Sequence, residues 1–334
     1  MRSFIFLSVI LSCTVSCVSK DSRHLASEEK KPLQIIGKRF LFEKYVDDSG
    51  FIQYYYLPAS SKNAPLIVSI QGSGCSSLFY KKDDVIMSRG SQVSIAELVS
   101  GKYGILAVEK PTVNTFDNFD RADGPDDCTE AYRQQFTAGL WTQTLKTALY
   151  DLLRSKSLNP EKIIVYGHSE GATFAAALAA EVPQVTHVIS SAGGGGGPLF
   201  DTISRLKKKK SSTADQGNID ILREIQKWQM MSADPDHSSQ YWGLSPRYWL
   251  SLMDYAPEKT LLKTNAYLYI VHGTEDTSAS IDTADFLVSE LISKKRRLFY
   301  NRKSGYDHSF NNTKGESHYS DMIGEALNWA VTSN

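Results

Sequence analysis

A pentapeptide with a serine at its centre is the part of the sequence best suited to covalent chemistry. It reads Gly167-His168-Ser169-Glu170-Gly171 and lies between an apolar run at 162–166 and an alanine-rich run at 172–180. The apolar run predicts a buried strand, and the alanine-rich run predicts a helix. Glycines at both ends permit a tight strand-to-helix turn with the Ser169 hydroxyl at its apex. We therefore expect a nucleophilic serine here; the alternative is an idle serine in a glycine-containing junction.

The elements that must position this serine alternate along the chain. Buried strands are expected at 65–70, 104–108, 162–166, 185–190, 267–271 and 297–300, after a hairpin of 39–43 and 51–56. Helices are expected at 130–155, 172–180, 281–293 and about 318–331. This alternation predicts an α/β fold whose central sheet is mostly parallel and has helices on both faces. Ligands of such folds bind at the carboxyl ends of the strands, where the serine turn also lies.

The strand, the serine turn and the following helix together resemble the α/β-hydrolase superfamily, whose members include serine esterases and peptidases. The resemblance covers residues 38–334, apart from an insertion at about 194–265. It implies an acyl-transfer triad in the chain order serine, acid, histidine. A base makes the serine hydroxyl nucleophilic, and a carboxylate fixes the tautomer of that base and stabilises its protonated form.

In this sequence the resemblance implies Ser169 as nucleophile, Asp276 as acid and His308 as base. Asp276 follows the expected strand at 267–271, and His308 lies in the glycine-containing loop 304–310 after the last expected strand. His318, at the start of the final helix, is the alternative base and is expected to cap or pack there. The other nearby carboxylates, those of Glu275 and Asp307, are expected to be solvated.

An oxyanion hole is expected from backbone N–H groups of Glu170, which follows the nucleophile, and of the loop 71–75. We place the second donor at Ser73, because Gly72 and Gly74 let the backbone approach a substrate closely. Superfamily members often have His-Gly in this loop, whereas this chain has Gln71-Gly72. The alternative is an ordinary glycine-rich turn.

The first residues resemble a secretory signal rather than part of the fold. A short basic start precedes the apolar run 4–11, which is too short to span a bilayer as a helix. Cys13 and Cys17 each follow a serine and partly match the bacterial lipoprotein box. We expect a signal peptide at 1–17, a polar tether at 18–37, and export to the periplasm or cell envelope. Lipidation at Cys17 or Cys13 would attach the protein to the membrane; plain cleavage of the signal is the alternative.

Export changes the interpretation of the remaining cysteines, Cys75 and Cys128. An oxidising compartment favours their pairing in a disulfide, and two separate buried thiols are the alternative.

The insertion at about 194–265, called the cap below, contains many residues able to cover a pocket. Its first segment, Gly193–Gly197, indicates a hinge or flexible connector, with a loop close to substrate as the alternative. Lys207–Lys210 indicates a solvated surface run rather than a patch for anionic lipid. Some of its large side chains are expected to roof the pocket: Trp228, Met230, Met231, Tyr241, Trp242, Tyr248, Trp249, Met253 and Tyr255.

Composition narrows the class of function. The 334 residues carry 37 basic and 37 acidic side chains, so binding of nucleic acid through bulk charge is excluded. Glycine and proline contents exclude collagen-like and disordered classes. The sequence has no dinucleotide fingerprint, phosphate loop or metal-ligand spacing, so we expect neither cofactor nor metal.

We therefore expect an exported serine hydrolase that cleaves carboxylic esters. Its substrate is expected to be a small-molecule ester or a short peptide. A serine peptidase of the cell envelope is the first alternative, and a non-enzymatic binding protein of the same fold is the second. The natural substrate and the oligomeric state stay open.

Overall fold

The computed structural model describes residues 32–34, 40–47, 50–82, 85–99, 101–113, 128–209 and 214–333. The predicted signal peptide, including Cys13 and Cys17, lies outside the described residues. Of the predicted tether, only the short strand β1 (Pro32–Gln34) is described, and it pairs with the edge of the sheet.

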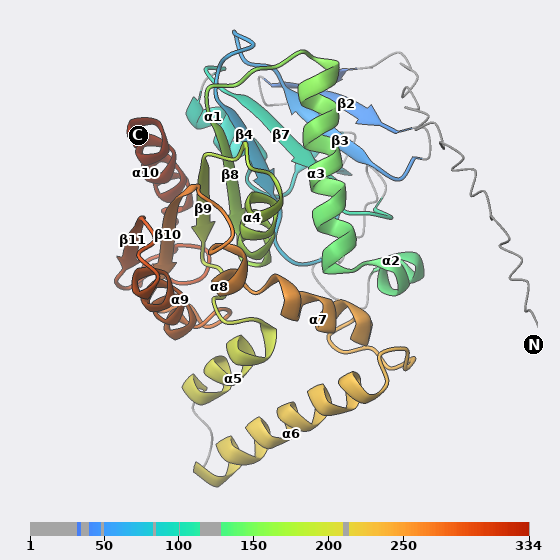
Figure 1. Ribbon diagram of the computed structural model, residues 1–334, viewed down its shortest axis with the longest axis vertical. Helices are drawn as coiled ribbons and strands as arrows, with labels where there is room; N and C mark the ends of the chain where they lie inside the picture. Colours follow the sequence, from blue (N-terminus) through green and yellow to red (C-terminus); the bar gives the residue numbers. More distant parts are fainter. Residues whose placement is uncertain are drawn as a thin grey trace, which may run out of the picture.

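A nine-stranded sheet forms the centre of the molecule, in the order β1-β2-β3-β7-β4-β8-β9-β10-β11 (Figure 1). Its other strands are β2 (Leu41–Val46), β3 (Gln53–Leu57), β4 (Leu66–Ile70), β7 (Gly104–Val108), β8 (Ile163–His168), β9 (His187–Ser191), β10 (Tyr267–Gly273) and β11 (Leu298–Lys303). The pairs from β1 to β7 are antiparallel, and every pair from β7 to β11 is parallel. The carboxyl ends of six strands therefore meet at one edge.

Helices cover both faces of this sheet, as the alternation of elements predicts. One core contains apolar side chains of α3 (Ala138–Ser155), α4 (Glu170–Glu181) and α9 (Ile281–Ser293). The other contains those of α1 (Gln92–Val99) and α10 (Tyr319–Thr332). Neighbouring residues of β4 show the alternation, because Val68 belongs to the first core and Ile67 to the second. Helix α1 and the hairpin of β5 (Phe79–Lys82) and β6 (Val85–Ser88) are additional to the predicted elements.

The predicted helix 130–155 is wrong as a single element. It is two helices, α2 (Glu130–Gln135) and α3, separated at Phe136 and Thr137. Phe136 is extended and fully buried, with its ring stacked on those of Tyr132 and Tyr248. The Thr137 side chain then caps the new helix by accepting from the Leu140 N–H. Burial of Phe136 thus interrupts a segment whose apolar spacing is helical throughout.

The cap consists of helices inserted between β9 and β10, below the sheet in Figure 1. They are α5 (Pro198–Lys208), α6 (Ala214–Ala233), α7 (Pro246–Leu252), a 3-10 turn (Met253–Tyr255) and α8 (Pro257–Thr260). Lys207, Lys208 and Lys209 are exposed, and Lys208 pairs with Asp282. Lys210 lies outside the described residues, and exposure fits both the expected solvated run and its alternative. Among the described helices, none has both the length and the apolar character needed to cross a bilayer.

Candidate active site

Ser169 occupies a strained turn between β8 and α4. Its backbone has φ 58° and ψ −129°, a conformation that costs free energy for a residue with a side chain. The flanking glycines make the turn sterically feasible. A Cβ added to Gly167 would lie 2.0 Å from the Gly171 carbonyl oxygen, and one added to Gly171 would lie 2.5 Å from that of Ile70. The pentapeptide therefore holds Ser169 at the apex of a tight strand-to-helix turn.

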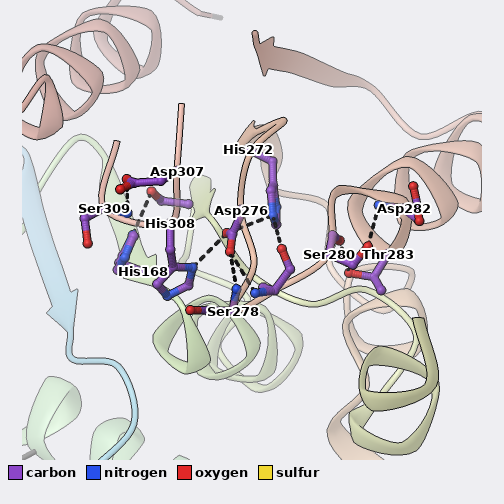
Figure 2. Close-up of polar contacts among 12 residues, drawn as sticks. His168, His272, Asp276, Ser278, Ser280, Asp282, Thr283, Asp307, His308 and Ser309 are labelled. Atoms are coloured by element: carbon purple, nitrogen blue, oxygen red, sulfur yellow. Dashed lines mark hydrogen bonds and ion pairs between the residues drawn. The ribbon is translucent and has the colours of Figure 1, made fainter. Parts of the chain in front are cut away.

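Asp276 and His308 are brought together from loops that follow β10 and β11. Figure 2 shows the His308 ring directed at the Asp276 carboxylate, with 2.7 Å between Nδ1 and Oδ2. The other carboxylate oxygen, Oδ1, accepts the N–H groups of Ser278 and Ala279, both at 2.8 Å. Burial alone would raise the pKa of Asp276, but hydrogen bonds from His272 and His308 hold that pKa well below its usual value. The Asp276 carboxylate is thus buried, ionised and fixed in orientation.

The His308 ring lies beside the serine turn. Its ring centroid is 5.0 Å from that of His168, the residue before Ser169. Burial and the neighbouring His308 lower the pKa of His168 to about 3, so the His168 side chain is uncharged and packs beside the His308 ring. Among the described residues no hydrogen bond joins Ser169 Oγ to His308 Nε2, and Nε2 has no other protein partner. Catalytic hydrogen bonds of this kind often form only when substrate binds.

The alternative acids and base lie in other surroundings. His318 precedes α10, and its Nδ1 is 2.9 Å from an Asp321 oxygen. Glu275 is exposed, and Asp307 accepts the N–H groups of Ser309 and Asn311 within its own loop. The geometry therefore favours the Asp276–His308 pair.

The loop 71–75 lies directly against the serine turn. A Cβ added to Gly72 would lie 3.4 Å from Ser169 Cβ and 3.9 Å from its Oγ. Glu170 is the first residue of α4, where a backbone N–H has no partner within the helix. Among the described residues, neither the Ser73 N–H nor the Glu170 N–H donates a hydrogen bond. Both N–H groups therefore lack a protein acceptor, and they belong to the two segments that meet at the serine turn.

A disulfide joins Cys75 to Cys128, with their Cα atoms 5.5 Å apart and both residues buried. Cys75 is the last residue of loop 71–75, and Cys128 lies two residues before the start of α2. The prediction of a disulfide is therefore matched by the structure, and it connects the loop to the helix that contains Tyr132.

Two cavities border the serine turn. The smaller cavity has a volume of 220 Å³. It is lined by Ser169, Thr173, Trp249 and Leu252, and by Gly194, Gly197 and Pro198 at the start of the cap. The larger, of 810 Å³, is lined by loop 71–74 and by Tyr132, Trp242, Leu244 and Trp249. Of the predicted aromatic roof, Trp242 and Trp249 line these cavities, whereas Trp228, Met231 and Tyr248 are buried in packing.

The glycine run at 193–197 is packed closely against other parts of the chain, so the expectation of a flexible connector is wrong. The alternative, a loop close to substrate, stays a prediction. Gly194 and Gly197 line the smaller cavity. A Cβ on Gly194 would lie 1.8 Å from an Asp201 oxygen, and one on Gly195 would lie 2.0 Å from the Thr283 carbonyl oxygen. The run is glycine because other chain segments occupy the space that side chains would need.

Three sets of contacts in this region were not predicted from sequence. Lys110 contacts loop 72–74 and Glu170; Tyr248 contacts Glu170; and His272 contacts Asp276. Lys110 and His272 had a usable signal, because they lie at or just past the carboxyl ends of β7 and β10. Within the described part of the chain, no cluster of His, Cys, Asp and Glu is arranged to hold a metal ion.

Comparison with known proteins identifies the fold. An acylaminoacyl peptidase from Pyrococcus horikoshii superposes with a TM-score of 0.57 and 15% identity, covering 88% of this chain and 42% of that chain. Est1E from Butyrivibrio proteoclasticus, with ferulic acid bound, has a TM-score of 0.53 and 17% identity, covering 85% and 95%. Acetyl xylan esterase 1 from Thermoanaerobacterium has a TM-score of 0.53 and 13% identity, covering 90% and 86%.

These structures, the strand order and the cap establish an α/β-hydrolase fold for this chain. The chain spans about two fifths of the length of the first peptidases that it resembles (41% and 42%). No protein-family model matches the sequence, and no curated protein does so.

Proposed function

We propose that this protein is a serine hydrolase that cleaves carboxylic esters through an acyl-enzyme. The observation that carries the proposal is the Asp276–His308 hydrogen bond of 2.7 Å, formed beside the strained turn at Ser169. A binding protein has no need of a strained serine turn next to an imidazole that is hydrogen-bonded to a buried carboxylate. The fold shared with esterases and peptidases supports the same class of chemistry.

The geometry supports the following steps. Ser169 Oγ attacks the ester carbonyl carbon while His308 Nε2 removes the hydroxyl proton. The carbonyl oxygen becomes an anion that accepts hydrogen bonds from the Ser73 and Glu170 N–H groups. His308, now positively charged and stabilised by Asp276, returns the proton to the departing alcohol, which leaves an acyl group on Ser169. A water molecule, deprotonated by His308, then attacks the acyl group on Ser169. This step releases the carboxylic acid and restores the Ser169 hydroxyl.

Two features favour an ester over a peptide. Trp249 lines the cavity that contains Ser169, and Trp242 and Trp249 both line the larger cavity; such aromatic walls suit a small acyl or aromatic group. The two esterases also match this chain over most of their own lengths, whereas the peptidases match over less than half. An envelope serine peptidase is the second candidate, because the peptidase structures share the fold.

We also propose that the protein acts outside the cytosol, in the periplasm or cell envelope. The leader-like residues 1–17 motivate this location, and the Cys75–Cys128 disulfide supports it, because disulfides persist in oxidising compartments. Lipidation at Cys17 or Cys13 would then anchor the protein to a membrane. Mass spectrometry of the protein recovered from expressing bacteria tests both points.

A fluorophosphonate probe tests the proposed chemistry. We expect the wild type to be labelled on Ser169, and the Ser169→Ala variant to remain unlabelled. Turnover is then compared on nitrophenyl esters and on aminoacyl nitroanilides. Faster turnover of the esters supports the esterase, and faster turnover of the amides supports the peptidase. A folded wild type that neither labels nor turns over either series would contradict the hydrolase proposal.

A further inference from the structure

Lys110 is a buried cation that contacts both parts of the candidate oxyanion hole. It follows β7, and its side chain has no solvent exposure. Its Nζ atom donates to the carbonyl oxygens of Gly72 at 2.7 Å and Gly74 at 2.8 Å, and to Glu170 Oε2 at 3.2 Å. An ammonium group costs several kcal/mol to bury without partners. All three of its donors are matched by acceptors within the site.

The contact with Gly72 sets the direction of the Ser73 N–H. The described peptide bonds are all trans, so a carbonyl and the N–H of the next residue point in opposite directions. Because Lys110 holds the Gly72 carbonyl toward the interior, the Ser73 N–H points away from Lys110. Gly72, Ser73 and Gly74 line the larger cavity, and Gly72 lies against Ser169. Rotation of this peptide would break the Lys110 contact and turn the donor away.

The contact between Lys110 and the Glu170 side chain fixes the residue whose backbone N–H is the second candidate donor. The side chain of Glu170 is held at Oε2 by Lys110 and at Oε1 by the hydroxyl of Tyr248, a residue of the cap helix α7. The backbone N–H of the same residue is the other candidate donor of the oxyanion hole. Tyr132 adds a further bond to the Gly74 carbonyl at 3.1 Å. One cation therefore connects the loop that contains Ser73 to the residue that follows the nucleophile.

We propose that Lys110 is a positioning residue of the oxyanion hole, holding the Ser73 and Glu170 N–H groups in the geometry that binds the oxyanion. The proposal rests on the serine hydrolase function given above. Lys110 does not border the reacting atoms, so its effect passes through the peptide groups that it fixes. Donors that are fixed before reaction stabilise the transition state without reorganisation, and losing one such donor typically lowers kcat about 100-fold to 1,000-fold.

The test compares Lys110→Met with a matched control, Lys162→Met. Lys162 also donates to three acceptors, the carbonyl oxygens of Ala330, Val331 and Ser333 at 3.0, 2.8 and 2.8 Å, but at the other end of the sheet. We expect Lys110→Met to lower kcat on a nitrophenyl ester about 100-fold with KM within about threefold. Affinity for a trifluoromethyl ketone, which forms an oxyanion on Ser169, should fall in parallel. Lys162→Met should lose thermal stability but keep its kcat.

The outcomes separate this proposal from the function on which it rests. If the wild type is active and Lys110→Met keeps a kcat within about threefold of it, the positioning role is wrong and the hydrolase stands. An inactive wild type overturns both. Should Lys110→Met fail to fold, Lys110→Gln keeps an N–H donor without the charge. The Lys110→Gln variant should then show a lower kcat and a lower affinity for the ketone, with KM unchanged. A kcat and a ketone affinity equal to those of the wild type would overturn the proposal.

Discussion

The Nε2 atom of His272 lies 3.1 Å from Oδ2 of Asp276, the same oxygen that accepts the hydrogen bond from His308. His272 Nε2 is also 2.9 Å from the Ala279 carbonyl oxygen, which only accepts, so this nitrogen carries a hydrogen. Its Nδ1 is buried and has no partner among the described residues. His272 is therefore a second imidazole that holds the acid in place from the side opposite His308 (Figure 2).

Replacing His272 should weaken catalysis without abolishing it. His272→Leu removes a donor from Asp276, so the carboxylate becomes less well oriented and its pKa rises toward the usual value. We expect kcat to fall about 10-fold to 100-fold, because a hydrogen bond to a charged group is worth about 1.5–3 kcal/mol. Steady-state kinetics on a short-chain nitrophenyl ester measure it. The control is His187→Leu, because His187 is buried away from the site beside Tyr267 and Trp329. Equal losses in the two variants would mean that His272 has only a structural role.

Variants of the three central residues give the largest expected effects. Ser169→Ala and His308→Ala should each lower kcat about 10⁴-fold to 10⁶-fold with folding retained. Asp276→Asn should cost about one to two orders of magnitude less, because its role is to orient His308 and stabilise its charge. His318→Ala is the matched control, since its ring bonds Asp321 instead. Near-normal activity in His308→Ala together with loss in His318→Ala would transfer the role of base to His318.

The sequence predicts the serine turn and the parallel sheet because their signals are local. A tight turn needs glycines at 167 and 171, and buried strands need apolar runs, whatever surrounds them. Lys110, Glu170 and Tyr248 meet only after the chain has folded, from segments separated by 60 and 78 residues. Nothing in the residues near Lys110 indicates which carbonyls it will bind.

Two predictions failed because tertiary contacts outweighed local preference. Apolar spacing over 130–155 fits one helix, but the burial of Phe136 between Tyr132 and Tyr248 interrupts it. Successive glycines indicate flexibility when read alone, whereas Gly194 and Gly195 are needed because Asp201 and Thr283 lie against them. In both cases the local structure depends on contacts with residues that become neighbours only in the folded chain, such as Tyr248 for Phe136 and Thr283 for Gly195.

Asp201 should make stability depend on pH. Burial, opposed by the Gly195 and Gly196 N–H groups, raises the pKa of Asp201 to about 6. In the unfolded chain the pKa of Asp201 is near 4, its ordinary value. Between about pH 4 and pH 6 the unfolded chain therefore releases this proton while the folded protein keeps it, so the free energy of unfolding falls as pH rises. The penalty should therefore grow by up to about 2 kcal/mol between pH 4.5 and 7.5.

Urea unfolding of the wild type and Asp201→Asn at these two pH values measures this penalty. The variant should gain stability relative to the wild type at pH 7.5 and much less at pH 4.5. Asp254→Asn, at an exposed position, is the control and should show no such change. A difference between wild type and Asp201→Asn that is the same at both pH values would contradict the prediction.

Reduction of the Cys75–Cys128 disulfide should destabilise the fold. Opening a loop with a sequence separation of 53 residues costs about 4 kcal/mol in the chain-entropy model. We expect the double variant Cys75→Ser, Cys128→Ser to melt well below the wild type, and reducing agent to lower the melting temperature of the wild type only. Calorimetry with and without reductant checks both. A reductant-insensitive wild type with two free thiols in peptide mapping would contradict the pairing.

The size of the smaller cavity predicts a preference for short acyl chains. Each methylene buried there should improve kcat/KM by up to roughly fourfold, from about 0.8 kcal/mol of burial free energy, until the 220 Å³ are filled. Rates on nitrophenyl esters should therefore rise from acetate to a short or medium chain and then fall.

A pair of leucine variants locates the acyl group. Leu252 lines the smaller cavity and Leu244 lines the larger, so each can be enlarged separately. Leu252→Ala should move the optimum to longer chains, because it makes room beside Ser169, whereas Leu244→Ala should leave the optimum unchanged. A shift in Leu244→Ala alone would place the acyl group in the larger cavity, next to loop 71–74 and Trp242. An optimum that neither variant moves would show that the acyl chain occupies neither cavity, and the predicted chain-length limit would then be wrong.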